Sequence, residues 1–141
     1  MESPASWHDV LAIRSVLDRY ACGIDRKDWA LFASCFTEDV TADYGRNGQY
    51  SGRDAFVAAF DEMHRPPVGA TLHRITNHDI TVDGDTAHAV SAFDAVLQAE
   101  HKGFQLLHVI GTYTDDLRRT DDVWRIARRR AESIMYRREH A

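Results

Sequence analysis

A carboxylate and an imidazole, the two groups that together make a general base, stand at the boundaries of predicted elements. Asp25 comes just after the first predicted helix, and His73 opens the first long strand-like segment. A buried Asp that keeps one imidazole nitrogen protonated leaves the other nitrogen free to accept a proton near neutral pH. Each residue also has a simpler interpretation, because Asp25 or Asp28 could cap the second helix and His73 could lie near the surface at a strand end. The pair therefore predicts a base only if the fold brings both side chains together.

Other polar residues are candidates for the same site. Tyr20 lies on the apolar stripe of the first helix, where a core role is the simpler interpretation, although a buried hydroxyl needs a partner. Tyr44 ends a predicted short strand. His108 interrupts an apolar strand-like segment, so it is either a core histidine with a backbone partner or a pocket residue. We expect three apolar side chains to contact the substrate around this site: Phe56, Ile75 and Ile110.

Sequence signatures of metal, nucleotide and nucleophile chemistry are missing. The chain has no His-Glu-x-x-His or Cys-x-x-Cys zinc pattern, no Gly-x-Gly-x-x-Gly or phosphate-binding loop, and no Gly-x-Ser-x-Gly. A metal site built from Asp25, His73 and His108 is geometrically conceivable, but it is a minor alternative. We therefore expect neither a metal nor a cofactor.

Composition and charge fit a single acidic domain. The chain has 141 residues, with 17 Lys and Arg against 22 Asp and Glu for a net charge of -5. This balance argues against a nucleic-acid partner, and the run Arg128–Arg130 alternates between the two faces of a strand. No apolar run approaches the roughly 20 residues of a membrane span, and no secretory signal is apparent. We expect a cytoplasmic protein without membrane contact, in which Cys22 and Cys35 are buried free thiols rather than a disulfide.

Helical periodicity dominates the first half of the chain. Ser6 can cap the first helix, Gly23 suits its C-terminal end, and Pro66-Pro67 ends the last helix. The predicted elements are a helix at about 7–22, a helix at about 27–35, a short strand at 40–44 and a third helix that follows Ser51–Asp54.

After Gly69 the apolar period changes from 3.6 to 2, which predicts strands. Alternation places Thr71, His73, Ile75 and Asn77 on one face. The strand segments lie at about 70–82, 86–99, 104–117 and 123–136, with turns at Asp83-Gly84, near His101–Gly103 and at Arg119–Asp122.

Strands of about 12 residues, against a usual 5–6, indicate a strongly curved sheet. Helices that precede a run of strands are typical of an α+β fold. We predict a cone-shaped α+β barrel, with the N-terminal helices packed against a strongly curved, mainly antiparallel sheet. One domain spans 1–141, with a structured core at about 7–136.

Four stretches of the sequence resemble the SnoaL-like branch of the nuclear transport factor 2-like superfamily. They are Tyr20–Trp29, Phe36–Tyr44, Leu72–Asp85 and Gly111–Ile126. The branch includes scytalone dehydratase, polyketide cyclases, bile-acid dehydratases and hexachlorocyclohexane dehydrochlorinase. The resemblance extends over nearly the whole chain, and it is more specific for the fold than for the reaction.

The resemblance implies roles for individual residues. Asp25 and His73 match the dyad shared by the dehydratases and the dehydrochlorinase, and Tyr44 matches a tyrosine that helps to polarise the substrate carbonyl. The second tyrosine of scytalone dehydratase falls at Ile24, so Tyr20, one helical turn earlier, is the substitute. Two further residues are carried over as pocket residues, His108 as the acid that protonates the leaving hydroxyl and Arg129 as a lining residue.

The implied function is a cofactor-independent lyase of the dehydratase type. Its substrate would be a small, largely apolar oxygenated molecule such as a polyketide- or steroid-like metabolite. An isomerase or cyclase with the same dyad is the nearest alternative, and a non-catalytic ligand-binding or scaffold member would explain Ile24. We also expect a homodimer through sheet faces, because more apolar residues are present than three helices can cover: Val90, Phe93, Val96, Leu107, Val109, Ile134 and Tyr136.

Overall fold

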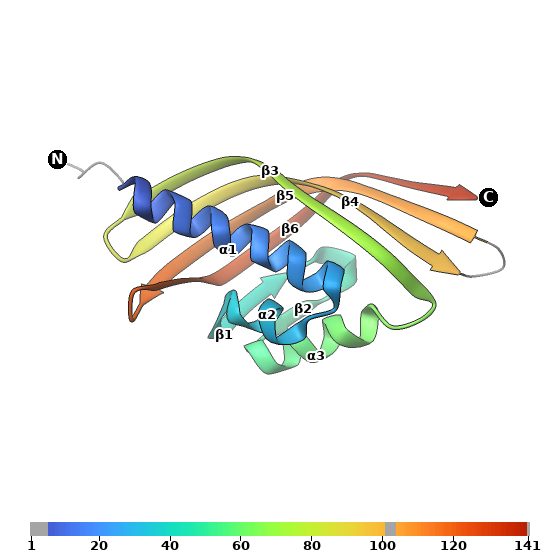
Figure 1. The fold of residues 1–141 in the computed structure, drawn as a ribbon, viewed down its shortest axis with the longest axis horizontal. Coiled ribbons are helices and arrows are strands. Elements are labelled where there is room, and N and C mark those ends of the chain that lie inside the picture. The colour runs from blue at the N-terminus through green and yellow to red at the C-terminus, as the bar shows by residue number, and fades with distance from the viewer. Residues whose placement is uncertain (1–5, 101–103, 141) are drawn as a thin grey trace.

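A curved six-stranded sheet wraps around three helices that lie against its concave face (Figure 1). The computed structural model describes residues 6–100 and 104–140. The predicted α+β class, with helices on one side of a strongly curved and mainly antiparallel sheet, is confirmed. Among the described residues, no helix combines the length and apolarity needed to cross a membrane.

Helix α1, Trp7–Arg26, begins where predicted and ends one turn later than predicted. Ser6 caps it by accepting a hydrogen bond from the Asp9 backbone N–H. The helix ends at Lys27, which takes the left-handed conformation with φ 53°. Gly23 is therefore not the end of the helix, and Asp25 lies inside its last turn rather than after it.

Gly23 is required for a close approach between helices instead. A Cβ atom at this position would lie 2.8 Å from the backbone nitrogen of Phe32. Phe32 lies in α2, Trp29–Ser34, which Asp28 caps by accepting from the Leu31 backbone N–H. The missing side chain thus lets α2 pack directly across the end of α1.

The remaining elements of the first half form a small hairpin and a third helix. Strand β1 is longer than predicted, and β2 was not predicted at all because it has only three residues. A short 3-10 turn at Gly45–Asn47 separates them. Cys35, at the end of α2, is buried, Cys22 is half-buried, and both are free thiols. The bounds are β1 Phe36–Asp43, β2 Gln49–Ser51 and α3 Arg53–Met63.

Four long strands complete the sheet in the order β2-β1-β6-β5-β4-β3. Consecutive long strands are antiparallel, and β1 pairs in parallel with β6. The turns at Gly84 and at Asp121-Asp122 lie where the sequence predicts them. The predicted turn at His101–Gly103 lies outside the described residues. The bounds are β3 Val68–Asp83, β4 Thr86–Glu100, β5 Phe104–Thr120 and β6 Val123–His140.

A bulge in β3 changes which residues face inward. The pairing of β3 with β4 shifts between Thr76 and Asp79, and Asn77 takes a left-handed φ of 55°. His78, not Asn77, then faces Ser91, with 2.9 Å between Nδ1 and Oγ. The prediction that Asn77 shares a face with His73 is therefore wrong, because strict alternation does not survive a bulge.

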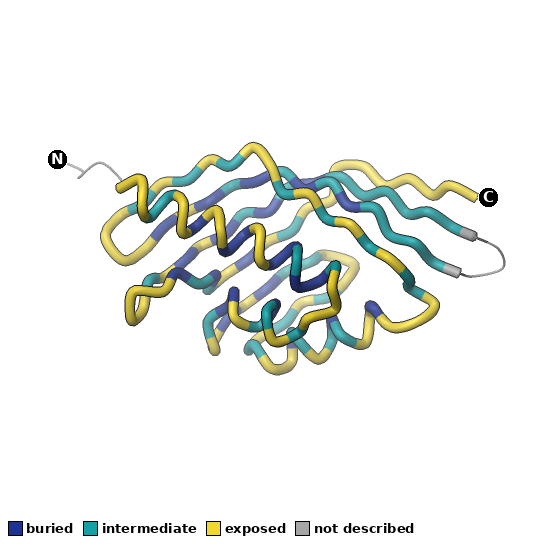
Figure 2. The backbone as a smooth tube through the Cα atoms, viewed as in Figure 1, coloured by how far each residue is buried: buried dark blue, intermediate teal, exposed yellow. Residues whose placement is uncertain are grey.

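The core lies between α1, α2 and α3 and the concave face of the sheet, and much of it is aromatic. Phe32, Phe36, Phe56 and Phe60 pack with ring centroids about 5 Å apart. Figure 2 shows the buried residues where helices cover the sheet, whereas the C-terminal half of β6 is exposed. The strand ends beyond α3 therefore have a concave face that no described helix covers (Figure 1).

The residues behind the expected homodimer divide between the two sheet faces. Phe93 is buried and Val109 packs against the core, so neither contributes to the outer face. Leu107 pairs with Leu97 in the same row as Thr71 and also faces inward. The outer face is thus less apolar than expected, and the homodimer stays a prediction.

The contact at Gly23 predicts an effect opposite to helix propensity. Alanine in a helix is normally more stable than glycine by about 1 kcal/mol. Gly23→Ala should instead lower the free energy of unfolding by about 1–3 kcal/mol, because the new methyl group forces α2 away from α1. Urea unfolding followed by circular dichroism measures the change. Ser15→Ala, at an exposed position of α1, is the control and should be neutral or slightly stabilising. A Gly23→Ala protein as stable as wild type would contradict the close contact between Gly23 and Phe32.

Candidate active site

Asp25 and His73 lie in direct contact at the junction of α1 and β3. The His73 Nδ1–H donates to Asp25 Oδ1 over 2.7 Å. The side chain of His73 is 9% exposed and that of Asp25 is 16% exposed. The shared hydrogen bond and the low exposure fit a general base. They do not fit the alternatives, in which His73 lies at the surface and Asp25 caps a helix. Asp28, not Asp25, caps α2.

The carboxylate of Asp25 is held by two further hydrogen bonds. Thr71 Oγ1 donates to Oδ1 over 2.9 Å, and the backbone N–H of His73 donates to Oδ2 over 2.9 Å. Burial raises the pKa of Asp25, but the hydrogen bonds from His73 and Thr71 outweigh it, so this pKa lies below its usual 3.8. Asp25 is therefore ionised at neutral pH and acts as an acceptor only.

This arrangement fixes the chemistry of the imidazole. Because the ionised carboxylate can only accept, Nδ1 carries the proton, and in the neutral ring Nε2 keeps its lone pair. Within residues 6–100 and 104–140, no hydrogen bond joins His73 Nε2 to another side chain or backbone group. Nε2 is therefore the atom that can take a proton from a ligand.

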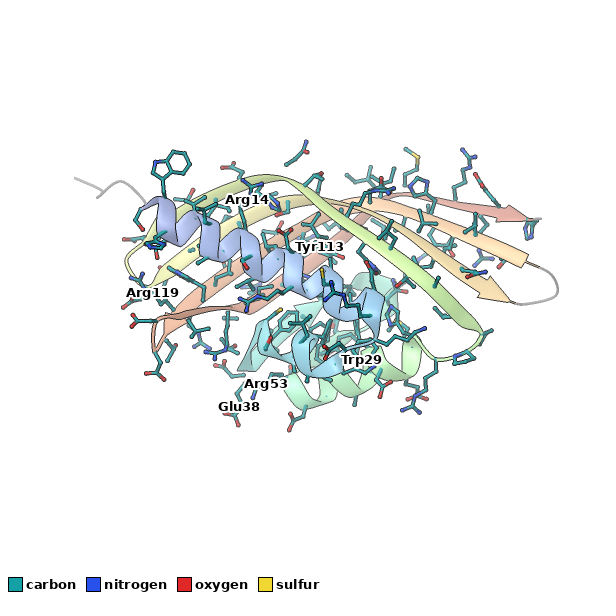
Figure 3. All side chains as sticks on the ribbon, in the orientation of Figure 1. Arg14, Trp29, Glu38, Arg53, Tyr113 and Arg119 are labelled. Carbon is teal, nitrogen blue, oxygen red and sulfur yellow. The ribbon has the colours of Figure 1, made fainter. Side chains whose placement is uncertain are left out.

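Three tyrosine hydroxyls converge beside the core. The Tyr20 hydroxyl lies 2.8 Å from that of Tyr44 and 3.3 Å from that of Tyr113. Tyr113 lies between α1 and the strands (Figure 3), and its ring stacks on Phe93 with centroids 4.4 Å apart. Burial raises the pKa of Tyr20, Tyr44 and Tyr113, so all three remain protonated and able to donate.

Arg129 holds this tyrosine cluster together from inside the protein. Its guanidinium donates to both carboxylate oxygens of Asp115, over 2.7 and 2.8 Å, and both side chains are fully buried. Its carbon Cζ lies 4.1 Å from the ring centroid of Tyr20 and 4.0 Å from that of Tyr113. A terminal nitrogen also donates to the Tyr44 hydroxyl over 3.4 Å. Arg129 therefore supports Tyr44 and does not face a ligand.

His64 is a second histidine near the dyad that the sequence analysis did not identify. It follows α3, it is 5% exposed, and its Nδ1 lies 2.7 Å from the carbonyl oxygen of Phe60. Burial lowers the pKa of His64, the hydrogen bond to Phe60 opposes this in part, and the positive charge of Lys27 lowers the pKa further. The available signal was its position four residues after Phe60, on the apolar stripe of the helix.

The sheet register places His108 away from the dyad. His108 pairs with Val96 and shares the outer face with Asp94, to which its Nε2 lies at 2.6 Å. His73 pairs with Ala95, on the inner face. The expectation that His108 acts beside His73, or completes a metal site with the dyad, is therefore corrected. Among the described residues, no three potential metal ligands lie together.

The predicted substrate-contacting residues are also only partly brought together. Ile75 lies two residues beyond His73 on the inner face and packs against the core. Ile110 pairs with Asp94 and lies on the outer face. Phe56 has no exposed surface, because Phe32, Phe36 and Phe60 enclose it, so it is a core residue. Only Ile75 retains a position from which it can meet a ligand at the dyad.

Comparison with known proteins gives one family and a consistent fold. The model of the SnoaL-like domain matches residues 5–130. An uncharacterized protein of Mycobacterium tuberculosis, Rv2910c, is 32% identical over 130 residues, which is 92% of this chain and 88% of that protein.

Two solved structures have the same fold at lower identity. A putative scytalone dehydratase from Novosphingobium aromaticivorans is 24% identical with a TM-score of 0.82, over 94% of this chain and 89% of that chain. A hexachlorocyclohexane dehydrochlorinase, LinA-type3, from Novosphingobium barchaimii is 18% identical with a TM-score of 0.79, over 94% and 90%.

The depressed pKa of Asp25 predicts a pH-dependent contribution to stability. Asp25→Asn should lower the free energy of unfolding at pH 7 by about 1–3 kcal/mol, because a buried charge-assisted hydrogen bond is lost. The folded-state pKa lies below the unfolded one, so this contribution is present above about pH 4 and is lost as the pH falls through the folded-state value. Urea unfolding at pH 7 and pH 3 measures both effects.

Asp18→Asn is the matched control, since Asp18 is exposed on the same helix. It should change the free energy of unfolding by less than about 0.5 kcal/mol. A gap between wild type and Asp25→Asn that stays constant from pH 7 to pH 3 would contradict the ionised, hydrogen-bonded carboxylate.

Proposed function

Because the chain belongs to the SnoaL-like domain family, we propose that it is a cofactor-independent lyase of the dehydratase type, with His73 as its general base. The observation that carries the proposal is the 2.7 Å hydrogen bond between His73 and Asp25, both largely withdrawn from solvent. Two proteins of similar fold are named for eliminations, one a putative dehydratase and the other a dehydrochlorinase. A single positioned base is the minimum that such an elimination needs.

The first step is removal of a proton from a carbon next to a carbonyl group. His73 Nε2 takes this proton, and the imidazolium that forms is stabilised by the Asp25 carboxylate on the opposite nitrogen. The electron pair of the broken C–H bond moves onto the carbonyl, which becomes an enolate. Asp25 remains ionised throughout and holds the ring in place through its hydrogen bonds.

Tyr44 is the donor that we assign to the enolate oxygen. Tyr20 and Tyr113 are buried at 1% and 3% exposure, so neither can reach a ligand, whereas Tyr44 is half-buried. If Tyr113 donates to Tyr20 and Tyr20 donates to Tyr44, the proton of Tyr44 is left for the ligand. Such a preorganised donor can supply several kcal/mol of stabilisation to a developing oxyanion.

The second step expels a hydroxyl group from the β-carbon. Since His108 lies on the outer face, we assign the proton for this leaving group to the protonated His73 itself. The enolate re-forms the carbonyl, the carbon–oxygen bond breaks, and hydroxide leaves as water with the proton taken in the first step. The substrate is then converted to an unsaturated carbonyl compound and water, and the enzyme returns to its starting state.

Isomerisation is the second candidate, because the same base and donor suffice for it. If His73 returns its proton to a different carbon of the enolate, no leaving group is needed. Mass spectrometry of the product separates the two reactions, since dehydration lowers the mass by one water and isomerisation leaves it unchanged.

The base assignment predicts a large and selective loss of activity. Wild-type protein should dehydrate members of a panel of β-hydroxy aryl ketones, read out by ultraviolet absorption of the conjugated product. His73→Gln should lower kcat by at least about 100-fold, because general-base catalysis contributes that much or more.

His88→Gln is a matched control for this experiment. His88 also contacts a carboxylate, with 2.8 Å between its Nδ1 and Asp116 Oδ1, but that pair is more than half exposed. Its removal should leave kcat unchanged. An equal rate in wild type and His73→Gln, or no conversion of any ketone in the panel, would favour a non-catalytic, ligand-binding member of the family.

A further inference from the structure

A groove of about 750 Å³ lies on the open side of Tyr44. One wall is the end of β1 and the turn after it, with Asp43 and Arg46, and the other is the C-terminal half of β6, with Tyr136 and Arg138. This half of β6 extends past the helices (Figure 1). The groove therefore opens to solvent at one end and meets the proposed oxyanion donor, Tyr44, at the other.

The acidic side chains of the groove are already engaged. Asp43 Oδ1 accepts the backbone N–H of Gly45 over 2.9 Å and so stabilises the turn. Glu132 forms an ion pair with Arg130, with 2.9 Å between Oε1 and Nε. Neither carboxylate contacts Arg46 or Arg138, so the groove keeps an excess of positive charge.

Arg46 and Arg138 carry that positive charge. Arg138 lies over the ring of Tyr136, with 5.5 Å from Cζ to the ring centroid, and its Nε donates to the Tyr136 hydroxyl over 3.1 Å. Within the described part of the chain, no acceptor is hydrogen-bonded to the terminal nitrogens of Arg138, and Arg46 has no ion-pair partner. A guanidinium held through Nε presents its two terminal N–H groups as a fork that fits a carboxylate.

The groove and the dyad lie at opposite ends of one row of the sheet. Residues that pair across neighbouring strands share a face, and His73 pairs with Ala95, Ala95 with Val109, and Val109 with Tyr136. Three strand spacings of about 4.8 Å separate the ends of this row, which is roughly 14 Å measured along the sheet. The two residues between them in this row are apolar, with Ala95 buried and Val109 half-buried.

We propose that the groove is a subsite for a carboxylate group at the far end of an elongated, largely apolar substrate whose reacting carbon lies at His73. The arginines would bind the carboxylate, the half-buried Val109 would contact the apolar body, and Tyr44 would face the reacting carbonyl. This inference rests on the proposed function, because it describes the substrate of the same site. It adds a charge and a length to a substrate described so far only as small and apolar.

The charge is tested by binding a fluorescent probe, 2-anthracenecarboxylate, and its neutral methyl ester. Wild-type protein should bind the carboxylate at least about tenfold more tightly than the ester. Arg46→Gln and Arg138→Gln should each weaken carboxylate binding about fivefold, because each removes a charge-assisted hydrogen bond at a partly exposed site. Ester binding should not change in either variant.

Arg137→Gln is the matched control, because Arg137 is the next residue along β6 and pairs with His108 on the outer face. It should leave both dissociation constants unchanged. Equal binding of acid and ester by the wild type, or an equal loss in Arg137→Gln and Arg138→Gln, would overturn the subsite.

The length is tested by nuclear magnetic resonance of the histidine side chains. The three-ring carboxylate should shift the ring signals of His73, identified by their absence in His73→Gln, whereas benzoate, held at the arginines, should not. Shifts of His73 by benzoate, or none by the three-ring acid, would contradict the span. His73→Gln should retain the preference for acid over ester, because the subsite does not include His73. A wild-type protein that prefers the acid but dehydrates no ketone would refute the proposed reaction and leave the carboxylate subsite standing.

Discussion

The architecture around the site depends on one carboxylate. Asp25 lies in the last turn of α1, where the negative end of the helix dipole disfavours an acidic side chain by roughly 0.3–1 kcal/mol. Its three hydrogen bonds to Thr71 and His73 offset this and tie the end of α1 to the beginning of β3. The bond to the backbone N–H of His73 fixes the strand, and the bond to Nδ1 fixes the ring. The same residue therefore joins helix to sheet and sets the proton position on the proposed base.

A second buried carboxylate plays a corresponding part on β5. Removing Asp115 and Arg129 from water is costly, and the cost is recovered only if both groups are fully hydrogen-bonded. Both contacts of Arg129 to Asp115 are short, and its faces are covered by Tyr20 and Tyr113. This rigid cluster places the Tyr44 hydroxyl at the edge of the core. Arg129 thus acts on the site through Tyr44, and its complete burial explains why it cannot be a substrate ligand.

Helical and strand periodicity are local signals, so they were sufficient to predict the α+β class and the long strands. The pairing of Asp25 with His73 came instead from the resemblance to the SnoaL-like branch. The sequence was not sufficient to decide which strand residues lie on the inner face of the sheet and which on the outer face. Alternation identifies which residues share a face, but which face is covered depends on strand register, and His108 and Ile110 fall on the outer one. A bulge moved His78 inward in place of Asn77.

The remaining misses have similar physical causes. An apolar helix stripe looks the same whether it packs in the core or lines a cavity, so periodicity alone does not show that Phe56 lies in the core. Glycine is typical of helix ends, but Gly23 is required instead by the close approach to Phe32. Tyr113 and Asp115 are visible in the sequence, but their roles arise only from contacts with residues far along the chain.

The most direct test of the account is the nitrogen-15 chemical shifts of the His73 ring at neutral pH. The account predicts a protonated Nδ1 and an unprotonated Nε2 in the neutral ring, with this preference lost in Asp25→Asn; a proton on Nε2, or a preference unchanged by Asp25→Asn, would contradict it.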